Sequence, residues 1–460
     1  MYKLRLYQQN AVDKAVKCFK GKKNGILVLP TGSGKSIIIA SIADELGGKT
    51  LVFQPTKEIL EQNKEKMEAI GYSNVGVYSA SMGQKEVGDI TFATIGSVVK
   101  KKHLFADFDR IIVDECHKVN SKNGMYENFI NGLKLPTLGL TATPYRMRNY
   151  RDFRTDAYIA ESRILTRTRP RIFSKIVHIT QIQELFKLNF LCPLDYKWQN
   201  SYDSRKIKRT STGQGFDESA LERYNQEQEI VKKIIVLVEK TKQSHCLAFT
   251  KFTSESEQVV EALAKKNISC VEISAKTKKK DRERILADFK SGRIKCVVNV
   301  GVLTTGFDFP ELDCIILGRP TKSVALYYQM VGRGIRIADN KDSCRLYDLC
   351  DNVKRFGKVE TFEVYDQNGN DMWRLKSSAG DLTGIDVNTG QNLEKVTRPL
   401  NKDDDGDVLV PFGKHKGKKI TALDEGYLKW CVENFDNSKW KTPFKKELKR
   451  REVALCLKGE

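Results

Sequence analysis

Short apolar runs alternate with longer amphipathic stretches through the first third of the chain. The runs are almost continuously apolar, as strands buried on both faces of a sheet are. A stretch with helical spacing, 36–46, separates the first two runs and ends at Gly47-Gly48, which suits a helix C-terminus. Strands that alternate with helices favour a parallel sheet. The predicted strands are 26–29, 50–53, 90–93, 110–113 and 137–140.

The same alternation returns in the second half of the chain. Helical patterns at 255–265 and 280–289 separate apolar runs there, so we predict a second α/β domain. Its predicted strands are 244–249, 269–273, 295–299 and 314–317. We therefore expect an α/β protein with these parts: a first parallel-sheet domain at 1–170, a basic inter-domain segment at 171–224, a second parallel-sheet domain at 225–360, a linker at 361–404, and a small C-terminal α+β module at 405–460, with a strand at 408–412 and a helix at 426–434.

Two polar stretches between the predicted domains carry an excess of positive charge. The stretch 146–171 has eight arginines against three acidic residues, and 201–216 is rich in Gly, Ser and Thr around a basic cluster at 205–209. We expect 201–216 to be an exposed loop. Both stretches suit either a solvated linker or a phosphate contact, and the sequence leaves this choice open.

The overall charge narrows the classes of partner. The chain of 460 residues has 79 Lys and Arg against 58 Asp and Glu, a net charge of +21, with 40% hydrophobic and 30% charged residues. These proportions are ordinary for a globular protein and exclude wholesale disorder or a coiled-coil rod. The net charge favours a polyanionic partner, nucleic acid first, and the plainer alternative is a basic but merely soluble protein.

Membrane and secreted classes do not fit the sequence. No apolar run approaches the roughly 20 residues that span a bilayer, and residues 1–5 do not begin an apolar signal sequence. The 11 cysteines are scattered singly, and the closest pair is Cys344 and Cys350. This spacing argues against a disulfide framework and against a structural zinc site. We therefore expect no membrane partner and a cytoplasmic protein with free thiols.

A glycine-rich loop follows the first predicted strand. Residues 30–36 read P-T-G-S-G-K-S and lead into a predicted helix, which is the context of a phosphate-binding P-loop. Glycines let backbone N–H groups turn toward phosphate oxygens, and the helix N-terminus adds a favourable dipole. We expect Lys35 to reach the β- and γ-phosphates and Ser36 to ligate Mg²⁺, although Leu29 stands where the strict pattern has glycine.

Two adjacent acids follow the fourth predicted strand. Residues 108–117 read F-D-R-I-I-V-D-E-C-H, so this strand delivers Asp114 and Glu115 to the carboxyl end of the sheet, where parallel sheets bind ligands. We expect Asp114 to hold Mg²⁺, directly or through water. We expect Glu115 to orient and deprotonate the attacking water. The alternative is an ordinary solvated strand end.

Taken with the segments that follow, these residues resemble superfamily 2 helicases of the DExH type. The resemblance covers about residues 1–360, and the motifs occur in the family's order. The form of motif V is closest to bacterial RadD-type and related phage helicases. The matching segments are 4–8 (L-R-L-Y-Q, adenine recognition), 30–36 (motif I), 54–56 (Q-P-T, Ia), 93–97 (A-T-I-G-S, Ic), 114–117 (D-E-C-H, II), 141–144 (T-A-T-P, III), 249–250 (F-T, IV), 299–308 (V) and 329–336 (Q-M-V-G-R-G-I-R, VI).

The resemblance implies two tandem RecA-like domains that bind ATP and Mg²⁺ between them. It implies catalytic roles for Lys35, Asp114, Glu115, Gln329, Arg333 and Arg336, with the arginines as arginine fingers, and metal contacts from Ser36 and Asp114. The implied nucleotide contacts are Gln8, Thr31, Gly32, Ser33, Gly34, Lys35, Ser36, Gly306 and Asp308. The implied nucleic-acid contacts are Pro55, Thr56, Thr94, Thr250 and Thr304. The implied coupling residues are His117, Thr141 and Thr143.

The end of the chain resembles a small uncharacterised module often found beside nucleases in bacteria and phages. The resemblance rests on 411–418 (P-F-G-K-H-K-G-K) and 424–430 (D-E-G-Y-L-K-W). Its lysines, with Trp430 and Trp440, suit backbone contact and base stacking. The alternative is that both tryptophans form the core of the module. A protein partner of the chain would dock on this module.

The resemblance implies an ATP-dependent helicase or translocase that moves along one strand of single-stranded or branched DNA. It would serve recombination, repair or replication in a bacterial or phage-infected host cytosol. The nearest alternative is an RNA helicase, and Cys116-His117 favours DNA because DEAD-type RNA helicases have Ala-Asp there. A third alternative is an ATP-gated nucleic-acid clamp that recruits a partner and does not unwind.

Overall fold

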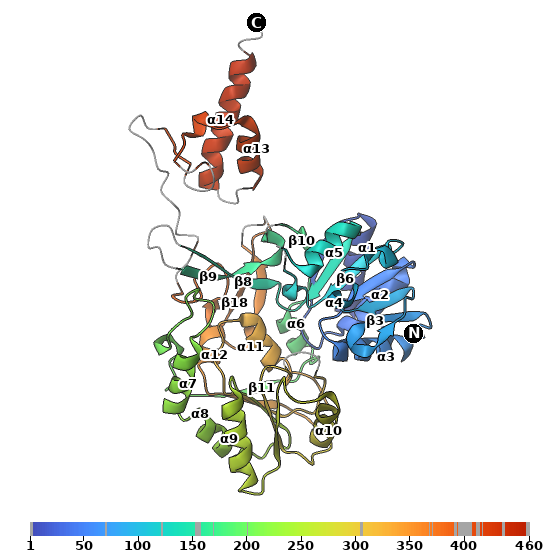
Figure 1. Cartoon of the computed structure of the whole chain (residues 1–460), viewed down its shortest axis with the longest axis vertical. Helices are drawn as coiled ribbons and strands as arrows, with labels where there is room; N and C mark the ends of the chain where they lie inside the picture. The colour runs from blue at the N-terminus through green and yellow to red at the C-terminus, as the bar shows by residue number, and fades with distance from the viewer. Residues whose placement is uncertain are drawn as a thin grey trace. The chain divides into compact units, whose positions relative to one another are not determined.

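The chain forms two compact units, Met1–Gln391 and Asn392–Glu460. The computed structural model describes residues 3–69, 71–120, 123–151, 158–168, 170–199, 201–303, 307–367, 369, 371–390, 393, 407–410, 415, 417–434 and 438–456. The larger unit contains two sheets of mostly parallel strands, which Figure 1 shows with their helices. This arrangement confirms the predicted α/β fold with two parallel-sheet domains.

The first sheet has eight strands in the order β10-β1-β7-β6-β2-β5-β3-β4, and its neighbours are parallel except for β3 and β4. The five predicted strands are confirmed to within one residue at each end, and they are buried throughout. The strands are β1 Gly25–Val28, β2 Thr50–Phe53, β3 Val75–Ser79, β4 Gln84–Lys85, β5 Ile90–Ala93, β6 Arg110–Asp114, β7 Thr137–Thr141 and β10 Lys175–Ile179.

Both faces of the first sheet are covered, which explains its continuous apolar runs. Ile26 and Val28 of β1 enter one core, and Leu27 enters another together with Ala11 of α1 and Ile38 of α2. The helices of this half are α1 Leu6–Lys20, α2 Lys35–Leu46, α3 Lys57–Ala69, α4 Ile95–Val98, α5 Met125–Leu133 and α6 Ile182–Lys187.

The second sheet has six parallel strands in the order β11-β16-β15-β12-β14-β13. The four predicted strands and the two predicted helices of this half are confirmed. Each strand from β12 to β16 begins with a cysteine. The elements are β11 Leu194–Trp198, α7 Glu218–Glu227, α8 Ile230–Lys240, β12 Cys246–Phe249, α9 Thr253–Ala264, β13 Cys270–Ile273, α10 Lys279–Lys290, β14 Cys296–Asn299, β15 Cys314–Leu317, α11 Val324–Val331, β16 Cys344–Asp348 and α12 Asn352–Phe356.

The structure divides the predicted inter-domain segment 171–224 between the two sheets. β10 pairs with β1 in the first sheet, and β11 pairs with β16 in the second. Both are edge strands with polar residues between apolar ones, so neither produces the continuous apolar run of a central strand. The expectation of an exposed loop at 201–216 is wrong in part, because Tyr202 and Ile207 are buried.

The prediction of a linker at 361–404 is wrong for its first part. Three strands of this part form an antiparallel sheet: β17 Glu363–Asp366, β18 Trp373–Ser377 and β19 Gly380–Asp381. Its buried side chains, Val364 and Leu375, alternate with polar ones, so the segment reads as polar overall. In the arginine-rich stretch 146–171, β8 Tyr145–Arg151 pairs antiparallel with β9 Tyr158–Ile164.

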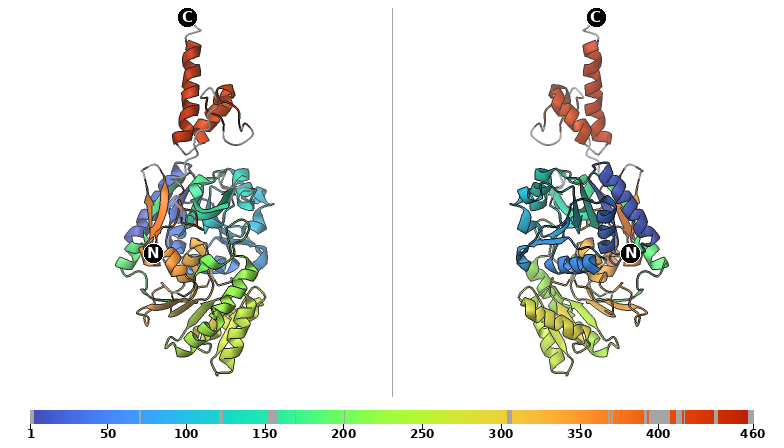
Figure 2. Two further views of the ribbon diagram at one scale, coloured as in Figure 1. Left: turned by 90° about the vertical axis from the view of Figure 1, so that its left-hand side faces the viewer. Right: turned by 90° about the vertical axis from the view of Figure 1, so that its right-hand side faces the viewer.

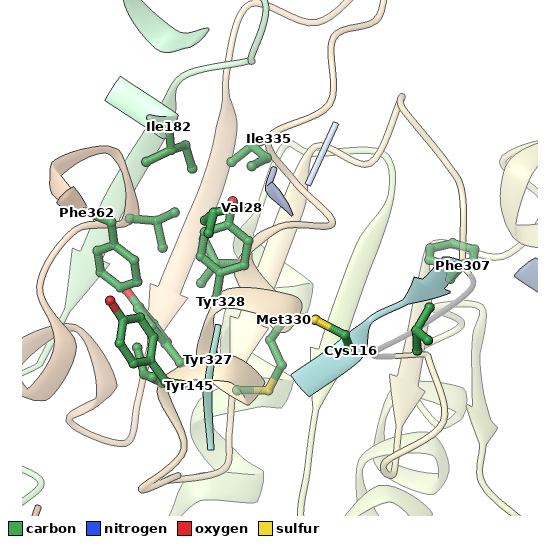
Figure 3. Packing of buried hydrophobic residues seen from close by; sticks show 14 of the residues in the cluster. Val28, Cys116, Tyr145, Ile182, Phe307, Tyr327, Tyr328, Met330, Ile335 and Phe362 are labelled. Atoms are coloured by element: carbon green, nitrogen blue, oxygen red, sulfur yellow. The ribbon is translucent and has the colours of Figure 1, made fainter. Parts of the chain in front are cut away.

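One hydrophobic core joins the two halves of the larger unit. Figure 3 shows Val28 and Cys116 from the first half in the same cluster as Tyr327, Tyr328 and Met330 of α11. The two views of Figure 2 show the first half in blue to green and the second half, in green to orange, against it. Packing between the halves therefore brings the carboxyl end of the first sheet toward α11.

The smaller unit has a core of its own. Its described elements are a bridge between Leu409 and Lys419, α13 Glu425–Asn434 and α14 Ser438–Cys456. The core consists of Val410, Ile420, Leu423, Leu428, Cys431 and Phe444. The predicted helix 426–434 is confirmed, and the end of the predicted strand 408–412 lies outside the described residues. Within the described residues, no helix has an apolar stretch long enough to cross a membrane.

Candidate active site

The glycine-rich loop joins β1 to α2 in a conformation that requires glycine. Gly32 and Gly34 have φ angles of 83° and 80°, in the left-handed region that favours glycine. A Cβ atom on Gly34 would lie 2.6 Å from Nε2 of Gln8. Ser33 between them is buried, and its hydroxyl has no hydrogen-bond partner among the described residues.

Side chains of α1 hold this loop in place. Tyr7 Oη and Gln8 Nε2 both donate to the backbone oxygen of Ser33, each at 3.0 Å. Gln8 Oε1 accepts from the backbone N–H of Arg5 at 2.9 Å, and the Arg5 guanidinium lies 3.8 Å from the centre of the Phe190 ring. Gln8 is buried and links the start of the chain to the loop, and it is not among the residues that line the cavity described below, so its adenine-reading role stays a prediction.

Lys35 and Ser36 begin α2 directly after the loop. Nζ of Lys35 donates to the backbone oxygens of Leu29 at 3.2 Å and Pro30 at 3.5 Å. The hydroxyl of Ser36 donates to Oδ1 of Asn63 on α3. Both predicted phosphate-side residues thus lie at one end of the loop, with side chains held by polar partners.

The two predicted acids lie at the carboxyl end of β6. Glu115 has a φ of 49°, and its backbone N–H donates to Oδ1 of Asp114 at 2.9 Å. Burial and the neighbouring Glu115 charge raise the pKa of Asp114 to about 7. Two carboxylates crowded in a buried site favour a cation, and Asp114 and Ser36 offer the oxygen donors that Mg²⁺ prefers. The residues present therefore fit a magnesium ion.

Residues of the second half face these groups. Arg333 is buried and donates from Nη1 to the backbone oxygen of Phe307 at 2.6 Å. Arg336 forms an ion pair with Asp308, whose other oxygen lies 3.9 Å from Nζ of Lys66. Burial lowers the pKa of both arginines to about 10, which leaves them cationic at neutral pH.

A cavity of about 400 Å³ brings these side chains together. This volume is in the range of small-molecule and cofactor sites. The first half contributes Arg5, Thr31, Gly32, Gly34, Lys35, Ser36, Asn63, Lys66, Asp114 and Glu115, and the second contributes Asp308, Arg333 and Arg336. Gly306 lies outside the described residues.

A chain of polar contacts leads from the acids to α11. Nδ1 of His117 lies 3.2 Å from Oε2 of Glu115 and 2.9 Å from the hydroxyl of Thr141. Nε2 of His117 lies 3.1 Å from Nε2 of Gln329. The Thr141 hydroxyl also accepts from the backbone N–H of Thr143 at 3.1 Å. The predicted coupling residues thus connect the acid pair with a residue of the second half.

The predicted nucleic-acid contacts are only partly brought together. Pro55, Thr56 and Thr94 line a second cavity of about 420 Å³ on the first half. Thr250 is 0% exposed, so it cannot contact a strand in this conformation. Thr304 lies outside the described residues.

Sequence reasoning missed Asn63, Lys66 and Phe190. Asn63 and Lys66 lie on α3, one turn apart, and both line the nucleotide-sized cavity. Residues 59, 62, 63 and 66, which follow the motif Ia segment, have the spacing of one helix face. This spacing is the sequence signal that could have pointed to Asn63 and Lys66. Phe190 follows a turn at Asn189, whose φ is 53°, and no spacing in the sequence points to it.

Two family models match this chain. That of the type III restriction enzyme res subunit matches residues 1–146, and that of the helicase conserved C-terminal domain matches residues 226–338. The chain is 27% identical over 374 residues to IRC3 of Saccharomyces cerevisiae, an inferred ATP-dependent helicase, covering 75% of this chain and 51% of that protein. It is 24% identical over 367 residues to the DNA 3'-5' translocase XPB2 of Sulfurisphaera tokodaii, covering 74% of this chain and 80% of that protein.

A solved structure supports the fold. The ATP-dependent type ISP restriction-modification enzyme LlaBIII bound to DNA matches with a TM-score of 0.55 at 17% identity, over 76% of this chain and 28% of that chain. The chain spans about half the length of the yeast relative. The two family models fall on the two sheets that meet at the cavity. The chain belongs to the superfamily 2 helicases.

Proposed function

We propose that the chain hydrolyses ATP in the cavity between the two halves and uses this hydrolysis to move along one strand of DNA. One observation carries the proposal: Lys35, Asp114 and Glu115 from the first half meet Arg333 and Arg336 from the second around one cavity. When two bodies supply the groups for one reaction, the reaction depends on their approach. Hydrolysis is then tied to relative movement of the halves.

The proposed roles follow from the chemistry of each side chain. Gln8 reads the adenine edge, and Thr31 and the glycines of the loop 31–34 surround the phosphates. Lys35 exchanges its carbonyl partners for the β- and γ-phosphates. Ser36 and Asp114 would hold Mg²⁺, which neutralises phosphate charge when bound.

The reaction needs an oriented water and positive charge at the γ-phosphate. We assign the water to Glu115, which His117 contacts at 3.2 Å. We assign the charge to Arg333 and Arg336, because arginine fingers accelerate hydrolysis by about 10³–10⁵ in related enzymes. Gln329 is connected to the γ-phosphate site through its contact with His117. Asp308 is assigned to the ribose.

DNA is the substrate that we propose. Two observations support this choice. The archaeal relative is named a DNA 3'-5' translocase, and Cys116-His117 favours DNA because DEAD-type RNA helicases have Ala-Asp at these positions. Hydroxyls such as Thr56 and Thr94 bind a phosphate backbone without reading sequence. Thr250 and Thr304 would join them in a conformation open to the strand.

The test is the ATPase rate without nucleic acid, and then with single-stranded DNA, forked DNA and RNA. We expect stimulation by DNA that disappears in Lys35→Ala and falls by about 10³-fold in Arg333→Ala. Lys17→Ala, which removes an exposed lysine of α1, serves as the matched control. Stimulation by RNA alone would move the substrate to RNA, and no stimulation by any of them would refute a coupled motor.

Strand displacement on the forked DNA separates the remaining alternatives. Release of a labelled strand during hydrolysis indicates a helicase. Displacement of a protein block without strand release indicates a translocase. Binding that depends on ATP without either activity would instead indicate a clamp.

A further inference from the structure

The smaller unit leaves the large ring of Trp430 half exposed. The core is built from aliphatic residues, Cys431 and Phe444. Trp430 is 49% exposed, although burial of a large ring would help to stabilise so small a unit. The alternative in which both tryptophans form the core is therefore wrong for Trp430, and the side chain of Trp440 lies outside the described part of the chain.

On α13 the exposed ring of Trp430 rests against the partly buried ring of Tyr427, and we call this pair the ledge. The ring centres of Tyr427 and Trp430 lie 5.7 Å apart with an interplanar angle of 20°. His415 packs against Tyr427, with ring centres 4.5 Å apart, and both its ring nitrogens are buried without a hydrogen-bond partner among the described residues. The half-exposed ring of Trp430, supported by Tyr427, offers a flat apolar surface whose natural complement is another flat ring.

The same unit carries an excess of positive charge. From 407 to 460 there are 13 Lys and Arg against 8 Asp and Glu. Lys445, Lys446 and Lys449 are exposed at positions i, i+1 and i+4 of α14, so they share one side of the helix. Within the described residues no carboxylate pairs with these three lysines, whereas Arg450 and Arg451 both pair with Glu447.

We propose that this unit binds single-stranded nucleic acid, with a base stacking on Trp430 and phosphates contacting Lys445, Lys446 and Lys449. A flat exposed ring and unpaired cations in one small unit match the two chemical parts of a single strand, its base faces and its backbone. A duplex keeps its base faces stacked inside, so it cannot occupy the ledge. The unit lies outside both family matches, so this site is separate from the proposed motor.

The first test maps contact directly on the full chain without nucleotide. Oligonucleotides of single-stranded DNA and RNA that carry 5-iodouracil are crosslinked by light, and the crosslinked peptides are identified by mass spectrometry. We expect crosslinks in the peptide that contains Tyr427 and Trp430. Crosslinks restricted to 1–391 would overturn the proposal. Because no ATP is present, the result does not depend on whether the larger unit hydrolyses ATP.

The second test measures binding by fluorescence anisotropy of the same oligonucleotides. Stacking on an aromatic side chain contributes about 1–3 kcal/mol per base, so Trp430→Ala should weaken binding to this site at least about fivefold, and Trp430→Phe should retain most of it. Trp198→Ala removes a tryptophan that is 50% exposed on the larger unit and is the matched control. Exposed positions such as these leave the fold intact.

The proposed contacts between the three lysines and the phosphates can be tested separately. Changing Lys445, Lys446 and Lys449 to Gln should weaken binding and lower the slope of log affinity against log salt by about 2. Equal affinity and slope in the variant and the parent would contradict the phosphate contacts. Binding of the parent to phosphatidylserine vesicles but not to oligonucleotides would replace nucleic acid with a membrane surface.

Discussion

At the residue scale, the phosphate-side loop is held in shape by side chains from two elements. Tyr7 and Gln8 of α1 donate to Ser33 from one side, and the hydroxyl of Tyr328 on α11 accepts from the backbone N–H of Thr31 at 3.2 Å. A loop fixed in this way loses little conformational freedom when a ligand binds. The contact from α11 also means that movement of the second half changes the support of the loop.

Gly34→Ala should destabilise the protein by about 1–2 kcal/mol, because an alanine at this left-handed position is strained. Its Cβ would also displace Gln8 from Ser33. Thermal unfolding measures the loss. Gly96→Ala is the control: Gly96 lies in α4, a Cβ there would meet nothing within 4 Å, and alanine favours a helix. Equal melting temperatures for the two variants would contradict the argument.

Motif chemistry could predict residues that act through short local patterns. Lys35 and Ser36 come after the buried strand β1, and Asp114 and Glu115 stand at the carboxyl end of the buried strand β6; the sequence marks such strands by apolar runs. Asn63 and Phe190 reach the same cavity only through packing of α3 and of the turn at 189–190. Thr250 shows the opposite failure: its place in the order of motifs predicted a nucleic-acid contact, but its side chain is buried, and a motif does not report burial.

At the scale of elements, Lys322 ties three segments together just before α11. Its Nζ donates to Oδ1 of Asn388 at 2.7 Å and to the backbone oxygen of Gly213 at 3.2 Å. It lies 4.8 Å from the ring centre of Phe216. Burial, with Arg209 and Arg355 nearby and Asp386 acting in the opposite direction, lowers the pKa of Lys322 to about 7.

This shift predicts a pH dependence of stability. Lys322 ordinarily titrates near 10.4, so between about pH 7 and pH 10 the unfolded chain holds a proton that the folded chain has released. The free energy of unfolding should therefore gain a contribution that rises with pH in this window and is lost as the pH falls toward 7. Urea unfolding at pH 7 and pH 9.5 should show a rise that is smaller in Lys322→Met.

Lys354→Met, which removes an exposed lysine of α12, is the matched control and should keep the parent's pH dependence. Identical dependence in Lys322→Met and in the parent would show that Lys322 keeps its proton on folding. Such a result would show that the favourable contacts of the Lys322 ammonium group outweigh the free-energy cost of burying its charge.

Strands differed in how well the sequence predicted them. Central strands such as β1 and β12 are buried on both faces and appear as continuous apolar runs. β17 to β19 bury only alternate side chains, and β10 and β11 lie at sheet edges, so their patterns resemble those of loops. Which edge a strand joins depends on contacts distant in sequence, such as the bond from Gln181 Nε2 to the backbone oxygen of Val364 at 2.6 Å.

At the scale of the whole molecule, separate cores predict separate unfolding. A chain of residues 1–391 should show the same main thermal transition as the full chain. A chain of residues 1–360 removes β17 to β19 and with them the buried Val364, Leu375 and Leu382. Each buried aliphatic side chain stabilises by about 1.5–3 kcal/mol, so this shorter chain should melt at a much lower temperature.

Calorimetry of the three chains checks both halves of this prediction. A lowered main transition in 1–391 would show that the smaller unit stabilises the larger one. An unchanged transition in 1–360 would show that β17 to β19 contribute nothing to the larger unit.

The cysteines that begin β12 to β16 allow the opening of the second sheet to be measured by chemical modification. Cys270, Cys296, Cys246 and Cys314 lie side by side across four strands, and the last three are buried. No strand of the first sheet contains a cysteine. Because Cys246, Cys296 and Cys314 are buried, an alkylating reagent reaches them only when the second sheet opens, so the rate of their modification measures how often the native sheet opens. Modification at these positions thus reports the opening of the second sheet with natural residues alone, because the strands of the first sheet contribute no thiol to the signal.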